Sequence, residues 1–185
     1  MILPIVAFGS TILRKKCENI NHNYPDLELL INNMWETMYN SNGVGLAAPQ
    51  VNIPIRMFII DTKPFSEDSD EEVSPIKKVF INPKITSEDG EFWIYKEGCL
   101  SIPDIREDIK RKSAIKIEYY DENFIFHTES YDGLSARVIQ HEYDHIEGKL
   151  FVDYISPLRK RFIKRKLEDI SRGKIKVSYK MNFSK

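Results

Sequence analysis

The sequence predicts an α+β fold in which small antiparallel or mixed β-sheets pack around a central helix. A further helix is expected near the N-terminus, and a C-terminal helix is followed by a short strand. Apolar residues recur at three- and four-residue steps in three segments. Other segments alternate apolar and polar residues, as half-buried strands do. No internal repeat or linker interrupts the 185 residues, so we expect one domain over residues 1–185.

The composition is that of an ordinary globular chain, with 42% hydrophobic and 30% charged residues. It excludes collagen-like, wholly disordered and disulfide-scaffold proteins. A net charge of −1 gives no polycation that would indicate DNA or another nucleic acid. The two cysteines, Cys17 and Cys99, favour a reducing setting inside the cell.

Targeting and membrane-spanning segments are not expected. The apolar residues 1–8 are short and have no positive charge before them, so we expect them to pack on the core. No apolar run approaches the ~20 residues of a spanning helix. We therefore expect a cytoplasmic protein without membrane contact.

The N-terminal helix is expected over residues 27–39, and Asp26 is expected to cap it by accepting hydrogen bonds from first-turn amides. Residues 43–50 (GVGLAAPQ) are too rich in glycine for a helix interior. The apolar residues of the helix fall on one face; they are Leu27, Leu30, Ile31, Met34, Trp35 and Met38.

Short strands are expected over residues 56–61, 79–85 and 93–95. Residues 62–78 are expected to form a loop. Five of the six residues at 67–72 are acidic, which is typical of a solvated insertion and less often of a cation or partner site.

The second half of the chain begins with a predicted hairpin of residues 114–120 and 124–130. Residues 135–147 are expected to be helical, ending at Gly148. Another helix is expected over residues 156–172, followed by a strand in which apolar and polar residues alternate.

The C-terminal helix has Ser156 as its expected N-cap and Pro157 as its first residue. Gly173 is expected to end it. Its predicted apolar stripe consists of Leu158, Phe162, Ile163, Leu167 and Ile170.

The strongest chemical signal is the HEYDH motif at residues 141–145. Residues four apart lie on one face of a helix, so His141 and His145 can converge on one metal ion. Glu142 is turned ~100° around the helix axis, which places it beside the metal as an acid/base and not as a ligand. The alternative is a pair of histidines satisfied in the core or exposed on the surface.

A third ligand is needed, because catalytic metals usually take three protein ligands and keep one position for water. Cys99 is the best candidate, since Gly98 allows close approach of the backbone. A lone buried cysteine is more often a packing residue, however. The other candidates are His22, His127, Cys17 and the carboxylates.

Three segments together resemble the motifs of peptide deformylases, and they occur in that family's order. The segments are GVGLAAPQ at 43–50, EGCLS at 97–101 and QHEYDH at 140–145. The resemblance covers roughly residues 2–170. Departures from the family are peripheral: Gly9-Ser10-Thr11 near the start, the acidic residues 67–72 and the tail after Gly173.

The resemblance implies a metal-dependent hydrolase that removes the formyl group from the N-terminal formyl-methionine of newly synthesised polypeptides. It implies Cys99, His141 and His145 as metal ligands and Glu142 as the general acid/base. Gln50 and the Leu100 amide would form the oxyanion hole, where such donors stabilise the developing charge. The family's metal is usually Fe²⁺, although Zn²⁺, Ni²⁺ or Co²⁺ suit the same ligands.

Substrate contacts are also expected from the resemblance. The glycine-rich segment would flank an extended peptide through backbone hydrogen bonds, and Arg106 and Arg111 could rim the cleft. The expected substrate-binding residues are Val44, Gly45, Leu46, Tyr95, Glu97, Gly98, Leu134 and Val138.

Residues 156–176 carry nine Lys or Arg and two acidic residues. This basic stretch is either a solvated helix face or, as in some bacterial deformylases, a contact with ribosomal RNA, which would be sensitive to salt.

Two other functions fit part of the pattern. A zinc peptidase would share the HEYDH motif and its activation of water, but it would not require Cys99 and Gln50. A non-catalytic metal-binding or ribosome-binding domain would be favoured by the loss of Glu142, Gln50 or a ligand, and all of these are present.

Overall fold

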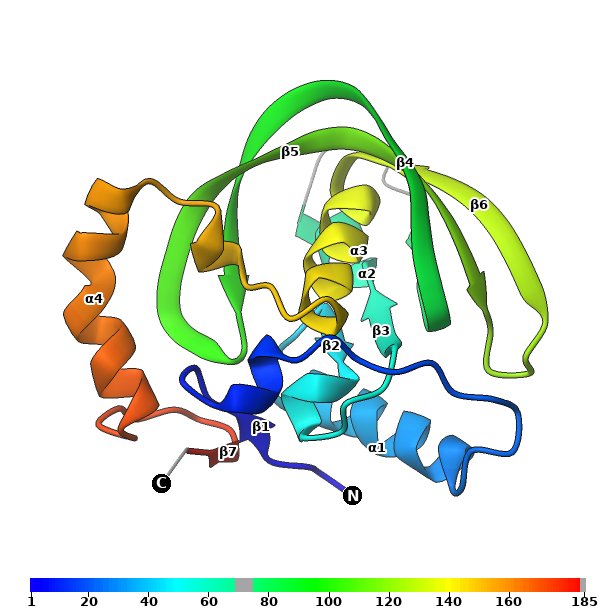
Figure 1. Ribbon diagram of the computed structural model, residues 1–185, viewed down its shortest axis with the longest axis horizontal. Helices are drawn as coiled ribbons and strands as arrows, with labels where there is room; N and C mark the ends of the chain where they lie inside the picture. The colour runs from blue at the N-terminus through cyan, green and yellow to red at the C-terminus, as the bar shows by residue number, and fades with distance from the viewer. Residues whose placement is uncertain (69–74, 184–185) are drawn as a thin grey trace.

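A five-stranded antiparallel sheet curves around one central helix in the computed structural model, which describes residues 1–68 and 75–183 (Figure 1). A separate pair of strands, β1 (Ile5–Val6) and β7 (Met181–Asn182), is parallel. This arrangement confirms the predicted α+β class. The order in the large sheet is β2 (Gly45–Ala47), β3 (Met57–Asp61), β4 (Lys77–Cys99), β5 (Ile102–Tyr120) and β6 (Phe126–Asp132).

The long strand β4 corrects the expectation of two separate strands over residues 79–85 and 93–95. The strand is continuous, and it stays paired with β5 although the register of the ladder shifts at four places, the first between Ile81 and Lys84. Such β-bulges allow a strand to contain a proline, here Pro83, and to bend while it stays paired with the neighbouring strand. The bent pair arches over the central helix (Figure 1). The hairpin of β5 with β6 is confirmed.

The central helix α3 (Gly133–Ile146) confirms the helix expected over residues 135–147. Ten of its fourteen residues are buried, and it contacts β2, β3, β5 and β6. Gly148 follows with φ +72°, and a Cβ there would come within 2.6 Å of the Arg14 carbonyl oxygen. A helix enclosed in this way holds its side chains in fixed positions.

The N-terminal helix α1 (Leu27–Asn40) lies where it was predicted, with its apolar face in the core. Alternate side chains of β3 point to opposite faces of the sheet. Met57 and Ile59 pack in the cluster of α1, whereas Phe58 and Ile60 pack in the cluster of α3. The sequence of a strand that is covered on both faces is a continuous run of apolar residues.

The expected capping by Asp26 is wrong. Asp26 has a left-handed backbone with φ 54°, and its side chain caps no amide. Its carbonyl oxygen instead accepts the first helical hydrogen bond, from the Leu30 N–H at 2.9 Å. Side-chain capping usually requires an N-cap residue with an extended backbone, and Asp26 does not have one.

The C-terminal helix α4 (Pro157–Ser171) begins as predicted, with the Ser156 side chain accepting from the Arg159 N–H. The predicted apolar stripe is only half correct. Ile163 and Ile170 are buried, but Leu158 and Phe162 are 66% and 70% exposed, because the helix packs on the core only from Ile163 onward. The helix lies at one side of the molecule (Figure 1).

The two chain ends meet in the small sheet. The segment β1 (Ile5–Val6) is buried, as expected for residues 1–8, and pairs with β7 (Met181–Asn182). The strand predicted after Gly173 is thus confined to two residues. No helix within residues 1–68 and 75–183 is long and apolar enough to cross a membrane.

Residues 62–78 are not a simple loop, because α2 occupies Lys63–Asp68. Residues 69–72 of the acidic stretch lie outside the described part of the chain. Among the residues that the structure describes, three short 3₁₀ helices complete the connections: η1 (Thr11–Arg14), η2 (Ala48–Val51) and η3 (Phe151–Asp153).

A polar cluster on the large sheet gives a prediction about acid stability. Glu129 accepts hydrogen bonds from Lys78 and Tyr119, each at 2.7 Å, and from Tyr131. Although burial raises the pKa of Glu129, these hydrogen bonds lower it to about 2. The unfolded value is about 4.3, so the stabilisation is fully present above that pH and is lost as the pH falls toward 2.

We therefore expect Glu129→Gln to flatten the pH dependence of the melting temperature between pH 5 and pH 2. Thermal unfolding followed at several pH values measures this effect. The matched control is Glu88→Gln on β4, an exposed carboxylate whose replacement should change the melting temperature little at any pH. Parallel curves for wild type and Glu129→Gln would contradict the prediction.

Candidate metal centre and cleft

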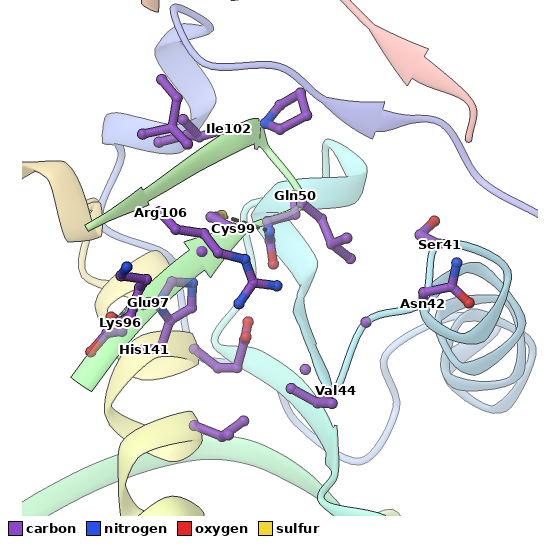
Figure 2. Close-up of a pocket in the computed structure, with 18 of the residues that line it drawn as sticks. Ser41, Asn42, Val44, Gln50, Lys96, Glu97, Cys99, Ile102, Arg106 and His141 are labelled. Atoms are coloured by element: carbon purple, nitrogen blue, oxygen red, sulfur yellow. Dashed lines mark hydrogen bonds and ion pairs between the residues drawn. The ribbon is translucent and has the colours of Figure 1, made fainter. Parts of the chain in front are cut away.

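A cleft of about 600 Å³ opens between α3 and the C-terminal end of α1. Figure 2 shows His141 on one side of it and Ser41 and Asn42 on the other, with the end of β4 carrying Cys99 between them. The cleft thus joins segments that are far apart in the sequence. It is the place where the three motifs meet.

Cys99 and the two histidines come together at the base of this cleft. His141 and His145 lie one turn apart on α3, and their ring centroids are 5.1 Å apart. The Cys99 Sγ is 3.3 Å from His145 Nε2, and the three donor atoms lie within 4.8 Å of one another. In the described part of the chain, His22, His127 and Cys17 do not join this group.

The donor set fits a divalent transition metal. A thiolate and two imidazoles are ligands that such ions prefer, and three protein ligands leave a position for water, as at catalytic sites. Burial holds the pKa of His145 well below its usual value, so its imidazole is neutral, the form that binds a metal. Glu142 Oε2 is also buried there without a hydrogen-bond partner among the described residues.

Glu97 fixes the orientation of His141, the first histidine of the motif. Its Oε2 accepts from His141 Nδ1 at 2.9 Å, which fixes the tautomer and leaves Nε2 to act as the ligand. The carboxylate also accepts from Arg111 Nε at 2.7 Å and from Arg137 Nη1 at 3.0 Å. Although burial acts to raise it, the hydrogen bonds from His141 and Arg111 hold the pKa of Glu97 well below its usual range.

The two arginines extend this network under the cleft. Arg111 Nη1 donates to Asp144 at 2.7 Å, and Tyr154 donates to the other oxygen of Asp144 at 2.9 Å. Arg137 donates to the carbonyl oxygens of Ile109 and Trp93. Arg111 is therefore a buried structural residue and does not rim the cleft, whereas Arg106 does line it.

Glu142 lies beside the donor set and is 4% exposed. Burial raises the pKa of its carboxyl to about 7. Its position depends on Gly45, because a Cβ at that residue would lie 2.8 Å from Glu142 Cδ. The glycine in β2 is thus required by the close approach of the carboxylate.

We expect Gly45→Ala to displace the Glu142 carboxylate while the rest of the fold is retained. A catalytic group moved by about 1 Å can cost about 10²-fold in rate, so the activity of this variant should fall by about that factor. Steady-state kinetics alongside thermal unfolding measures the effect. Gly133→Ala is a glycine control, because no atom lies within 4 Å of a Cβ there and Gly133 does not line the cleft. Its cost should appear in stability, from the left-handed backbone at φ +52°, and not in the rate. Equal activity for both variants would contradict this reading.

Gln50 is fixed on the opposite side of Cys99. Its Oε1 accepts from the Ala47 N–H at 2.8 Å, so its Nε2 is turned toward Cys99 Sγ at 3.5 Å and Ser101 Oγ at 3.2 Å (Figure 2). Leu100 and Ser101 form the two-residue turn between β4 and β5, since Cys99 pairs with Ile102. Gln50 and the Leu100 backbone therefore border the same space.

Most of the expected substrate-binding residues line the cleft: Val44, Gly45, Tyr95, Glu97, Gly98 and Val138. Two do not. Leu46 is wholly buried in the core cluster of α1, because alternate residues of β2 point to opposite faces, and Leu134 lies outside the wall at the start of α3.

Sequence reasoning missed three contributors. Arg137 precedes the HEYDH motif on α3 and Asp144 lies within it, and their charge within a buried helix was the available signal. Tyr179 lines the cleft from the C-terminal segment, and no local signal in the sequence indicates that.

The sequence and the fold of this chain are similar to those of known proteins. The sequence model of the polypeptide deformylase family matches residues 2–161. A peptide deformylase of Christiangramia forsetii is 59% identical, covering 99% of this chain and 96% of that relative. A peptide deformylase of Flavobacterium psychrophilum is 58% identical, over 98% and 96%. The crystal structure of a peptide deformylase from Legionella pneumophila is 35% identical with a TM-score of 0.81, over 94% and 98%.

Proposed function

The chain belongs to the polypeptide deformylase family, and we propose which of its residues carry out the family's reaction. That reaction is the hydrolysis of the formyl group from N-terminal formyl-methionine of newly made polypeptides, with release of formate. The observation that carries the assignment is the convergence of Cys99, His141 and His145 beside the buried Glu142. We take residues 1–185 as one catalytic domain.

We assign the metal to Cys99, His141 and His145, with Fe²⁺ as the resident ion; Zn²⁺, Ni²⁺ and Co²⁺ suit the same donors. When bound, a divalent cation supplies a Lewis acid that makes water a nucleophile near neutral pH. Glu97 orients His141 for this task through the hydrogen bond to Nδ1.

Glu142 is the proposed general acid/base. A carboxyl with a pKa near the working pH can accept a proton from water and later donate it to the leaving amine. Burial supplies that pKa, and Glu142 Oε2 has no competing hydrogen-bond partner among the described residues.

Gln50 and the Leu100 N–H are the proposed oxyanion-hole donors. The Gln50 amide is held by Ala47, so little reorganisation is needed as charge develops on the formyl oxygen. Removing one such donor typically costs about 2.7–4 kcal/mol of transition-state stabilisation.

The substrate is proposed to lie along β2 as an added strand. β2 is an edge of the sheet, so its outer backbone groups can pair with an extended peptide. Val44, Gly45 and Gly98 would provide this backbone surface. Tyr95 and Val138 would contact the methionine side chain, whereas Leu46 and Leu134 do not line the cleft.

We place the enzyme in the bacterial cytoplasm, with formylated nascent peptides as substrates and the ribosome as a partner of α4. The basic residues of 156–176 and the exposed Leu158 and Phe162 support that contact. Binding of isolated ribosomes should then weaken steeply with salt, because phosphate contacts release counterions.

The test of the function is formate release from a short formyl-methionyl peptide by protein purified without oxygen and with its metal retained. We expect fast release. The same peptide without the formyl group is the control for peptide-bond cleavage. A metal-replete sample that released no formate would contradict the proposal, and cleavage of the unformylated peptide would favour a peptidase.

A further inference from the structure

The C-terminal segment reaches the cleft although it lies outside the residues that the family model matches, 2–161. Tyr179 is partly buried and lines the cleft together with Cys99 and Leu100. Its hydroxyl donates a hydrogen bond of 2.7 Å to the Leu100 carbonyl oxygen. This segment is therefore in direct contact with the turn that follows the cysteine.

The segment is held by the N-terminal strand. The Ile5 N–H donates to the Lys180 carbonyl oxygen at 2.8 Å, and the Ala7 N–H donates to the Asn182 carbonyl oxygen at 2.9 Å. Figure 1 shows β7 beside β1, where both chain ends meet. Tyr179 is thus presented from a fixed backbone and not from a free tail.

The turn at Leu100 and Ser101 is restrained from several sides. The Leu100 side chain packs so closely on Gly43 that a Cβ there would lie 2.8 Å from Leu100 Cδ1. The Ser101 carbonyl oxygen accepts from the Phe8 N–H at 2.8 Å. The Leu100 carbonyl oxygen, the remaining acceptor of the turn, is the group that Tyr179 binds.

We propose that Tyr179 is a positioning residue. By holding the Leu100 carbonyl, which belongs to the Leu100–Ser101 peptide, it restrains the adjoining Cys99–Leu100 peptide so that the Leu100 N–H points at the formyl oxygen. The inference rests on the proposed function, in which that N–H is an oxyanion donor. A two-residue turn has few backbone torsions, so holding its carbonyl restricts the orientation of the neighbouring amide. Donors fixed before the reaction stabilise the developing charge best.

Tyr179→Phe tests this inference, because it removes the hydroxyl and keeps the ring that packs on the core. We expect kcat for the formyl-methionyl peptide to fall about three- to tenfold, the range expected for one neutral hydrogen bond. KM and bound metal should be unchanged, since an interaction made only in the transition state acts on kcat.

The matched control is Tyr119→Phe, which also loses a hydroxyl hydrogen bond of 2.7 Å, to Glu129, away from the cleft. Its kcat should equal that of the wild type. A second readout is NMR of the zinc-loaded protein labelled with ¹⁵N-leucine. The Leu100 amide should shift and exchange faster with solvent in Tyr179→Phe than in the control.

Four results would overturn the inference: an unchanged kcat, a rise in KM alone, a loss of metal, or an unperturbed Leu100 amide. A rise in KM would indicate a substrate contact, and a loss of metal would indicate support of Cys99. A wild-type protein that releases no formate would instead overturn the proposed function, so the two failures are distinguishable.

Discussion

Glu142→Gln should lower the rate of formate release by about 10²–10⁴-fold, the range contributed by a positioned general acid/base. The amide has the shape of the carboxyl but cannot accept a proton from water. The carboxyl is 4% exposed and lies beside the donor set, so no neighbouring solvated group can replace it. Steady-state kinetics on metal-replete protein measures the effect.

Two controls accompany this variant. Bound metal should equal that of the wild type, because the donors are Cys99 and the two histidines. Glu147→Gln, at the end of the same helix, removes a carboxyl that pairs with Arg56 and Lys16 and should leave kcat unchanged. Full activity of Glu142→Gln would show that another group moves the proton.

Glu97→Ala should have the largest effect on stability, about 3–5 kcal/mol in the free energy of unfolding. Removing one member of a buried charge network leaves its partners uncompensated, and Arg111 and Arg137 are 7% and 2% exposed. His141 also loses the acceptor of its Nδ1 proton. Metal affinity should therefore fall about 10–100-fold, as for other partners of ligating histidines.

Urea unfolding and competitive metal titration measure the two effects of Glu97→Ala. Glu107→Ala is a matched control, because Glu107 lies directly opposite Glu97 in the β4–β5 ladder and is similarly buried. Its partner Arg159 is exposed, so the loss of stability should be much smaller and metal affinity unchanged. Equal effects in the two variants would contradict a special role for Glu97.

Much of the candidate site could be predicted from local sequence. The spacing of His141 and His145 places both rings on one face of α3, since 3.6 residues per turn fix that relation. Gly98 was expected to allow close approach of the backbone to the metal, and Gly45 was expected to contact the substrate. The structure adds that the size of a side chain at residue 45 is limited by the carboxylate of Glu142. These features depend on residues close in the chain or on the size of one side chain.

Other features depend on partners far away in the chain. The network around Glu97 needs Arg111 from β5 and Arg137 from α3, and neither spacing nor residue type predicts their convergence. Leu158 and Phe162 have helical spacing, yet they are exposed because α4 runs past the edge of the core. Periodicity predicts a face but not whether another element covers it.

The sequence by itself determined the α+β class, the central helix with its two histidines and glutamate, and the family. The tertiary structure decided how Cys99 reaches those histidines and how Tyr179 reaches Leu100. The physical reason is the range of the interactions. Helical periodicity and capping act over a few residues, whereas the bulges that bend β4 and β5 and the pairing of β1 with β7 bring together residues that only the folded chain makes neighbours.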